Sequence, residues 1–192
     1  MEGIRLLIMI SIIFFVIIQR LVEVFVAKRN EKKMKALGAF EVGQSHYPFM
    51  LALHISFFIS LIGEILIFNR QLSPIFIWLF TLFLLTQGLR IWCLTSLGPF
   101  WNTKIIILPG ANVIKKGPYL FFRHPNYLVV CIEILVLPLI FQAYFTAICF
   151  TILNFAMLSI RIPLEEQALM DATNYKKKFK KNLSTPVVKD HH

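Results

Sequence analysis

The sequence predicts an all-α integral membrane protein with about five transmembrane helices. Hydrophobic residues make up 57% of the 192 residues, and the mean hydropathy is +0.70, whereas soluble domains are about 45–50% apolar. The hydrophobic residues are gathered into five segments whose lengths approach that of a bilayer-spanning helix. The length allows one membrane domain, residues 1–192. All three cysteines fall in apolar runs, which favours packing roles over a disulfide framework or a zinc site.

The five segments are Ile4–Val26, Tyr47–Phe68, Ile75–Leu97, Tyr127–Phe141 and Ala143–Ile160. The first lies where a signal peptide would lie, but it is long and lacks a small-x-small cleavage site, so we interpret it as a retained span. The fourth has 15 residues and contains Glu133 and Pro138. As a helix it is only about 22 Å long, which leaves open whether it crosses the full hydrocarbon thickness. Because only Gln142 separates it from the fifth, we expect segments four and five to form a short helical hairpin.

Positive charges are distributed unequally between the two sides of the predicted membrane. Sixteen of the 20 lysines and arginines follow segment one, lie between segments three and four, or follow segment five. Only Arg5 and Arg70 lie on the other side. The positive-inside rule therefore predicts, in the cell membrane, an N-terminus outside and a C-terminus in the cytoplasm. A net charge of +10 would suggest a nucleic-acid partner in a soluble protein. Here its distribution indicates orientation among membrane lipids, and we expect no nucleic-acid partner.

The chain after the fifth segment has a helical pattern of its own. From Leu164 to Leu183, apolar residues recur at steps of three or four, which is a helical period. The other positions are largely polar or charged and include three consecutive lysines, Lys176–Lys178. This pattern predicts a cytoplasmic amphipathic helix that folds back over the membrane surface.

Apart from Arg5 at the outer end of the first segment, five charged residues lie within the predicted spans: Arg20, Glu23, Glu64, Arg90 and Glu133. Each is a functional candidate, because a charge at the bilayer centre costs about 2.5–3.5 kcal/mol even on insertion scales. Arg20 and Glu23 are three residues apart and share a helix face, which favours a simple ion pair. Glu64 and Arg90 lie nearer the span ends, where they can snorkel or pair across helices. Glu133 follows His124 by about two helical turns, which makes it a candidate for the substrate side of the same cavity.

Two polar clusters flank the helical hairpin on the predicted cytoplasmic side. The first, Gly117–Tyr127, combines Arg123 and His124 with two tyrosines and two prolines. The second contains Arg161 and Glu165, four residues apart and therefore on one helix face. Taken singly, the first could be a cap that contacts lipid headgroups, and the second an ordinary ion pair. Their coincidence at one membrane face indicates a site for a polar ligand.

The clusters match a known family pattern. Gly117-Pro118-Tyr119, Arg123-His124-Pro125-x-Tyr127 and Arg161-Ile162-x-x-Glu165-Glu166-x-x-Leu169 together resemble the isoprenylcysteine carboxyl methyltransferase family. The approach through Arg90, Trp92, Leu97-Gly98, Trp101 and Thr103 is similar to the third-helix region of that family. Arg20-Leu21-x-Glu23, followed by Arg29-Asn30, resembles its small bacterial branch.

The resemblance implies an integral-membrane O-methyltransferase that uses S-adenosylmethionine without a soluble Rossmann-type fold. It implies a cofactor site formed by residues 98–127 and 161–175 at the cytoplasmic face. The cofactor-binding residues would be main-chain groups of Asn112, Val113 and Ile114, together with Tyr119, His124, Pro125, Asn126, Tyr127 and Glu165. The catalytic residue would be Arg161, orienting the acceptor, with Glu133 and Arg90 as further candidates on the substrate side.

The implied acceptor is lipophilic: the carboxylate of a prenylcysteine-like compound or prenylated partner, or the enol of a long-chain alkylpyrone. Both the carboxylic acid and the enol are acidic, so no strong general base is needed. The sulfonium of S-adenosylmethionine is already activated for methyl transfer, so we expect no metal. Two alternatives stay open. Membrane sterol-type reductases share a similar Arg-His-Pro-x-Tyr region and bind NADPH, for whose extra phosphate Lys115 and Lys116 are the obvious candidates. A non-catalytic membrane scaffold would leave both clusters without a cofactor.

Overall fold

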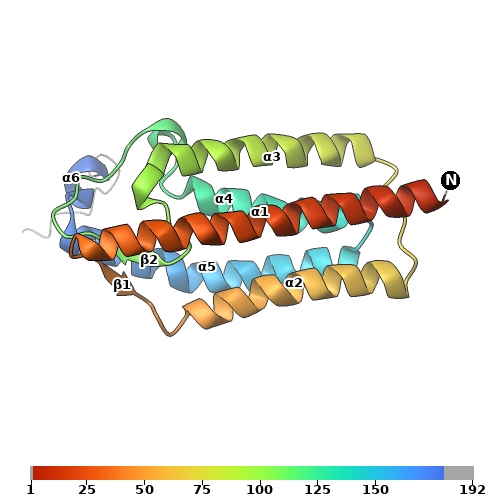
Figure 1. Cartoon of the computed structure of the whole chain (residues 1–192), viewed down its shortest axis with the longest axis horizontal. Helices are drawn as coiled ribbons and strands as arrows, with labels where there is room; N and C mark the ends of the chain where they lie inside the picture. Colours follow the sequence, from red (N-terminus) through yellow and green to blue (C-terminus); the bar gives the residue numbers. More distant parts are fainter. Residues whose placement is uncertain (1, 180–192) are drawn as a thin grey trace, which may run out of the picture.

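The computed structural model describes residues 2–179 and contains five main helices that run alternately in opposite directions (Figure 1). They are α1 (Glu2–Ala36), α2 (Tyr47–Ile67), α3 (Phe76–Leu97), α4 (Pro125–Ile140) and α5 (Tyr144–Ala172). Among the described residues, four helices are long and apolar enough to cross a membrane, and α4 is a shorter apolar helix. The predicted class, an all-α membrane protein, is therefore confirmed.

The connections that carry polar residues gather at one end of the bundle. This polar end consists of residues 37–46, 98–124 and 165–179 (Figure 1). It contains the 3-10 helices η1 (Gly98–Phe100) and η2 (Gly117–Leu120), and the short helix α6 (Tyr175–Phe179). Strands β1 (Phe40–Val42) and β2 (Ile105–Ile107) pair there in antiparallel register, with Phe40 opposite Ile107. The three side chains of β2 are buried, so this small sheet anchors the connection after α1 to the connection after α3.

Two helices extend further than the hydrophobic pattern predicts. α1 continues past Val26 to Ala36, because the lysine-rich stretch consists of good helix formers. It ends just before Gly38, whose φ of +92° is a typical helix stop. α5 continues past Ile160, through Pro163, to Ala172. Hydropathy marks where apolar residues stop, whereas a helix stops where its backbone hydrogen bonding stops.

The predicted separate helix Leu164–Leu183 is therefore wrong in its boundaries. Leu164–Ala172 is the last part of α5, and within the described residues the short α6 follows it. The break lies at Thr173, whose backbone is extended and whose hydroxyl donates to Leu169 O at 2.5 Å. The last residues of the prediction, 180–183, lie outside the described part of the chain.

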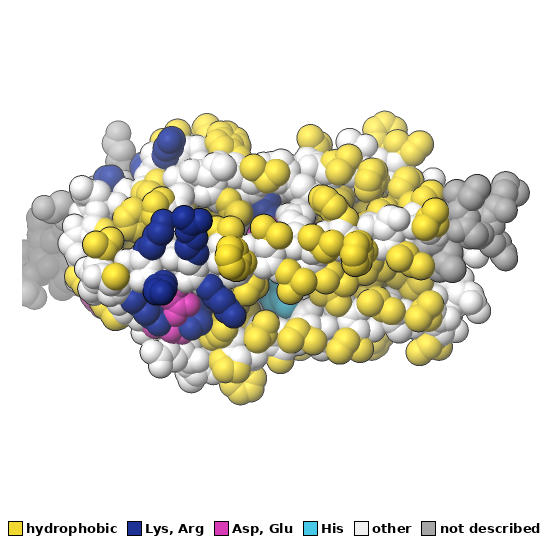
Figure 2. All heavy atoms as spheres, viewed as in Figure 1, with side chains coloured by type: hydrophobic (Ala, Val, Ile, Leu, Met, Phe, Trp, Pro, Cys, Tyr) yellow, Lys and Arg dark blue, Asp and Glu magenta, His cyan; other side chains and the backbone are white. Residues whose placement is uncertain are grey.

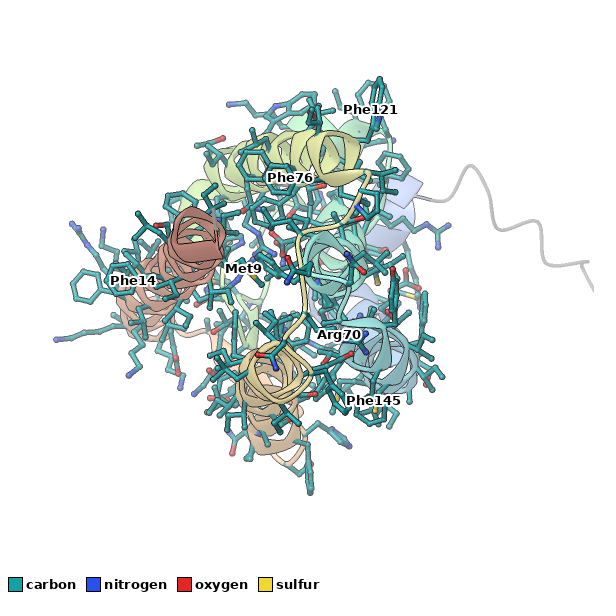
Figure 3. The ribbon with its side chains drawn as sticks, turned by 90° about the vertical axis from the view of Figure 1, so that its right-hand side faces the viewer. Met9, Phe14, Arg70, Phe76, Phe121 and Phe145 are labelled. Atoms are coloured by element: carbon teal, nitrogen blue, oxygen red, sulfur yellow. The ribbon has the colours of Figure 1, made fainter. Side chains whose placement is uncertain are left out.

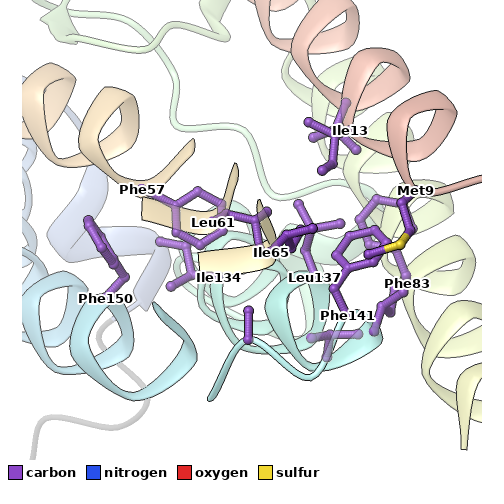
Figure 4. Packing of buried hydrophobic residues seen from close by; sticks show 14 residues of the cluster. Met9, Ile13, Phe57, Leu61, Ile65, Phe83, Ile134, Leu137, Phe141 and Phe150 are labelled. Atoms are coloured by element: carbon purple, nitrogen blue, oxygen red, sulfur yellow. The ribbon is translucent and has the colours of Figure 1, made fainter. Parts of the chain in front are cut away.

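Apolar side chains divide between the core and the outer surface. Seen end-on, Met9 points between the helices, whereas Phe14 and Phe145 point outwards (Figure 3). The core contains Leu61, Phe83, Leu137 and Phe141, all almost fully buried (Figure 4). The exposed hydrophobic side chains cover the length of the bundle, while lysine and arginine gather near the polar end (Figure 2). This distribution matches a belt of protein surface in contact with lipid.

Glu64 has a structural role at the opposite end of the bundle. Its carboxylate accepts hydrogen bonds from the Thr146 main-chain N–H and hydroxyl, both at 2.8 Å, and from the Phe145 N–H at 3.3 Å. Arg70 pairs with it at 3.0 Å. Because the first N–H groups of a helix have no intrahelical partner, the Glu64 side chain stabilises the start of α5.

Candidate functional site

The turn at Gly117 packs directly on α3. Gly117 has a φ of +57°, and a Cβ atom there would overlap Ser96 Oγ and lie 2.8 Å from Trp92 Nε1. Glycine is therefore required both by backbone conformation and by space. The turn buries Tyr119. Burial, and then the Cys93 thiol and Glu165, raise the pKa of Tyr119, so its hydroxyl stays a neutral hydrogen-bonding group.

The two polar clusters contact each other through Tyr127. This residue lies in the first turn of α4, which begins at Pro125. Its hydroxyl donates to Glu165 Oε2 and accepts from Arg161 Nε at 2.9 Å. Arg161 is 7% exposed, and its Nη2 donates to the carbonyl oxygen of Thr103 at 2.6 Å. Two elements thus fix the plane of the buried guanidinium.

Glu166 joins the same constellation from α5. Its Oε1 lies 3.0 Å from His124 Nε2 and 3.7 Å from Arg123 Nη1. The Tyr175 hydroxyl donates to the same oxygen at 3.2 Å. Burial, and then the charge of Glu166, raise the pKa of Tyr175. The His124 ring also stacks on Tyr127, with centroids 5.4 Å apart, so the two carboxylate-centred groups form one unit.

A single cavity of ≈ 490 Å³ connects this polar unit to the interior of the bundle. Its polar part is lined by Tyr119, His124, Tyr127, Arg161, Glu165 and Tyr175. Its deeper part is lined by apolar residues that include Phe57, Phe83 and Leu137, which also belong to the hydrophobic core. The core therefore closes the cavity on the side away from the polar end.

The cavity also reaches the outer surface between α1 and α2. Leu21 of α1 and Leu51 and Ile55 of α2 line it, yet they are 64%, 45% and 52% exposed. Figure 2 shows a histidine side chain in the hollow between these helices. His54 of α2 lines the cavity and donates from Nδ1 to Met50 O at 2.8 Å. The apolar rim makes this opening suitable for a lipophilic molecule.

Four charged residues form a buried network in the cavity wall. We call Arg20, Glu23, Arg90 and Glu133 the ion quartet. Arg20 pairs with Glu23 and with Glu133, both at 2.6 Å. Arg90 pairs with Glu23 at 3.0 Å and with Glu133 through two nitrogens. The predicted Arg20–Glu23 pair is present, but it belongs to a network that connects α1, α3 and α4.

The structure places nearly all the predicted site residues around this cavity. Those that line it are Asn112, Val113, Ile114, Tyr119, His124, Asn126, Tyr127, Glu165, Arg161, Arg90 and Glu133. Pro125 is buried as the first residue of α4 and is absent from the lining. The sequence indicates no role for Glu166 beyond the family pattern, because helical geometry points its side chain about 100° away from that of Glu165. His124, which contacts Glu166, lies outside α5. The only signal for Glu166 in the sequence is therefore its position next to Glu165.

These features can be compared with known proteins. Residues 76–171 match the model of the isoprenylcysteine carboxyl methyltransferase (ICMT) family, a range that includes both polar clusters. The chain belongs to this family. Together with the membrane-length helices, this membership supports a membrane methyltransferase in general.

Two relatives from bacteria are similar over most of the chain. The uncharacterized protein YpbQ of Bacillus subtilis is 48% identical over 160 residues, which cover 83% of this chain and 95% of the relative. An uncharacterized protein of Haemophilus influenzae is 27% identical over 142 residues, which cover 73% of this chain and 83% of the relative. Neither name adds a substrate.

Proposed function

We propose that the protein transfers a methyl group from S-adenosylmethionine to an oxygen of a lipophilic acceptor, at the cytoplasmic face of the membrane. One observation carries this proposal: a single cavity joins the polar unit around Tyr127 to an apolar chamber with an opening between α1 and α2. A water-soluble cofactor can reach the polar part, and the acceptor can enter laterally from the lipid.

The residues of the polar part suit S-adenosylmethionine, which has a sulfonium, an amino-acid group, a ribose and an adenine. The carboxylate of Glu165 suits an ammonium or a hydroxyl pair, and Arg123 and His124 suit a carboxylate. The rings of Tyr119 and Tyr127 offer faces to a cation. We therefore place the cofactor between residues 98–127 and 161–175. Bound there, it would supply an activated methyl group.

Arg161 is the residue that we assign to the acceptor. Its Nε and Nη2 are held by Tyr127 and Thr103, so the guanidinium is oriented before any ligand arrives. A carboxylate or enolate beside it is favoured in its ionised form, which makes a general base unnecessary. In a site with little water, such a fixed charge interacts more strongly than in bulk solvent. Its remaining task is alignment, because an aligned acceptor oxygen lowers the barrier by several kcal/mol.

The first test is calorimetric binding of S-adenosylhomocysteine to the detergent-purified protein, with NADPH as the competing ligand. The double variant His124→Ala/Glu165→Ala removes one residue from each cluster, and Gln167→Ala, an exposed amide on α5, is the matched control. Saturable binding of S-adenosylhomocysteine, lost only in the double variant, supports the proposal. Binding of NADPH alone would indicate a reductase, and binding of neither would favour a scaffold.

The acceptor class and the orientation need separate measurements. Transfer of a labelled methyl group to N-acetyl-farnesylcysteine or to a long-chain alkylpyrone distinguishes the two acceptor chemistries, and Arg161→Leu should abolish either. For orientation, a cysteine introduced at Ser45, in the polar end before α2, should react with an impermeant maleimide only when the cytoplasmic side is opened. The background protein would lack its three native cysteines.

A further inference from the structure

The segment after α5 is fastened to the loop before η2. Four hydrogen bonds connect them. Gly110 N donates to Ala172 O at 2.9 Å, and Lys178 Nζ donates to Val113 O at 2.6 Å. The other two involve Asn174: its Oδ1 accepts from Val113 N at 2.9 Å, and its Nδ2 donates to Asn112 Oδ1 at 2.6 Å. We call this set of contacts the clasp.

Asn174 can make these contacts because it lies outside a regular helix. The chain leaves α5 at Thr173, whose backbone is extended, and α6 begins at Tyr175. Asparagine side chains readily replace main-chain partners at such breaks. Val113 lies in no helix or strand, so its N–H needs a partner from elsewhere. The Asn174 side chain supplies that partner.

Both sides of the clasp form the wall of the same part of the cavity. Asn112, Val113 and Ile114 line it from the loop, and Thr173 and Tyr175 line it from the C-terminal segment. Tyr175 is 4% exposed and contacts Glu166. The resemblance assigned the main chain of Val113 to the cofactor, but its N–H and its carbonyl already have protein partners. The clasp therefore holds the main chain of this wall in place through contacts to the C-terminal segment.

We propose that Asn174 is a positioning residue for the cofactor: through Val113 and Asn112 it holds the loop at residues 110–114 in the shape that binds the S-adenosyl compound. This inference rests on the proposed function. Asn174 itself need not contact the ligand. Without its side chain, the loop loses two of the four contacts that hold it, and part of the binding free energy is spent on ordering the loop.

The test is calorimetric titration of the full-length protein with S-adenosylhomocysteine. Asn174→Ala should weaken binding about tenfold, which corresponds to about 1.4 kcal/mol. Asn174→Asp should bind within about threefold of the unchanged protein. Its carboxylate can accept from Val113 N, and the Asn112 amide can rotate by 180° so that its nitrogen donates. Gln167→Ala, which removes two hydrogen bonds to Asp171 on the surface of α5, should bind like the unchanged protein.

A second readout separates positioning from general stability. Asn174→Ala should raise KM for S-adenosylmethionine while KM for the acceptor and the thermal midpoint change little. If this variant does not fold, Asn112→Ala removes the same amide contact from the other side and should weaken binding in the same direction. Equal or tighter binding by folded Asn174→Ala would overturn the inference while leaving the proposed function intact. Absence of binding by the unchanged protein would instead overturn the proposed function, and this inference with it.

Discussion

Removal of one carboxylate from the ion quartet should destabilise the protein strongly. The change is Glu133→Gln. Glu133 accepts from Gln87 Nε2 at 2.8 Å and Arg90 Nε at 2.9 Å on one oxygen, and from Arg20 and Arg90 on the other. Its side chain is 8% exposed. An amide keeps one acceptor oxygen but turns the other into a donor that faces two guanidinium groups.

The magnitude follows from the charge balance. The quartet has two positive and two negative members, so it is neutral as a whole. Glu133→Gln leaves two arginines facing Glu23 alone, which buries one uncompensated charge. Breaking a buried ion pair in this way costs about 3–5 kcal/mol. At about 2–4 °C per kcal/mol for a chain of this size, we expect the thermal midpoint to fall by about 6–20 °C.

The assay is thermal unfolding in detergent, with two further variants. Adding Arg20→Met to Glu133→Gln restores neutrality and leaves the Glu23–Arg90 pair at 3.0 Å, so at least half of the lost stability should return. Glu31→Gln makes the same chemical change in a more accessible ion pair with Lys35 and Lys104. There the cost should be at most about 1 kcal/mol.

Two results would refute this reasoning. If Glu133→Gln shifted the midpoint no more than Glu31→Gln, the quartet would not behave as a buried network. If the losses from Arg20→Met and Glu133→Gln simply added, the two residues would act independently, because coupled partners show non-additive free energies.

Three more results are expected. Glu64→Ala should lower the thermal midpoint in detergent by about 1–8 °C, since an N-cap is worth about 0.5–2 kcal/mol; an unchanged midpoint would contradict its role at the start of α5. Gly117→Ala should weaken S-adenosylhomocysteine binding in calorimetry, because its Cβ meets Ser96, whereas Gly63→Ala, with open space, should not. The raised pKa of Tyr175 means that its stabilising contact is complete below about pH 10, the free-tyrosine value, and is lost only as pH rises through the folded pKa. Tyr175 should therefore not ionise near pH 10 in the folded protein. The tyrosinate absorbance of folded Tyr175→Phe should rise around pH 10 by the same amount as that of the unchanged protein.

The sequence predicts those features that depend on neighbouring residues. Hydropathy finds the five helices, and spacing finds the Arg20–Glu23 pair. The order of the predicted spans also places the Arg-His-Pro and Arg-x-x-x-Glu clusters at one membrane face. In the structure, the Tyr127 hydroxyl connects the two clusters. These predictions rest on the period of a helix and the thickness of a bilayer, which apply to each segment regardless of which other segments pack against it.

Features that depend on packing between segments are not visible in the sequence. Arg90 and Glu133 are 43 residues apart and meet only because α3 packs on α4. Glu166 lies off the face of Glu165, and only the position of His124 on another element gives it a role. Asn174 reads as an ordinary polar residue in an amphipathic stretch until the break at Thr173 turns it towards Val113. Each case needs the relative placement of two helices or loops.

The way in which α1 is held explains how one helix can both close the cavity and leave an opening. Near its N-terminus, Met9 and Val16 pack in the hydrophobic core. In the middle, Arg20 and Glu23 pair with α3 and α4. Towards the polar end, Asn30 donates to the carbonyl oxygens of Gly98 and Trp101 at 3.1 and 2.8 Å. Leu21, between these points, lines the cavity together with Leu51 and Ile55 of α2 and is 64% exposed. A few directed polar contacts can thus hold α1 as a wall of the cavity. Continuous apolar packing between α1 and α2 would instead fill the opening through which a lipophilic acceptor would enter.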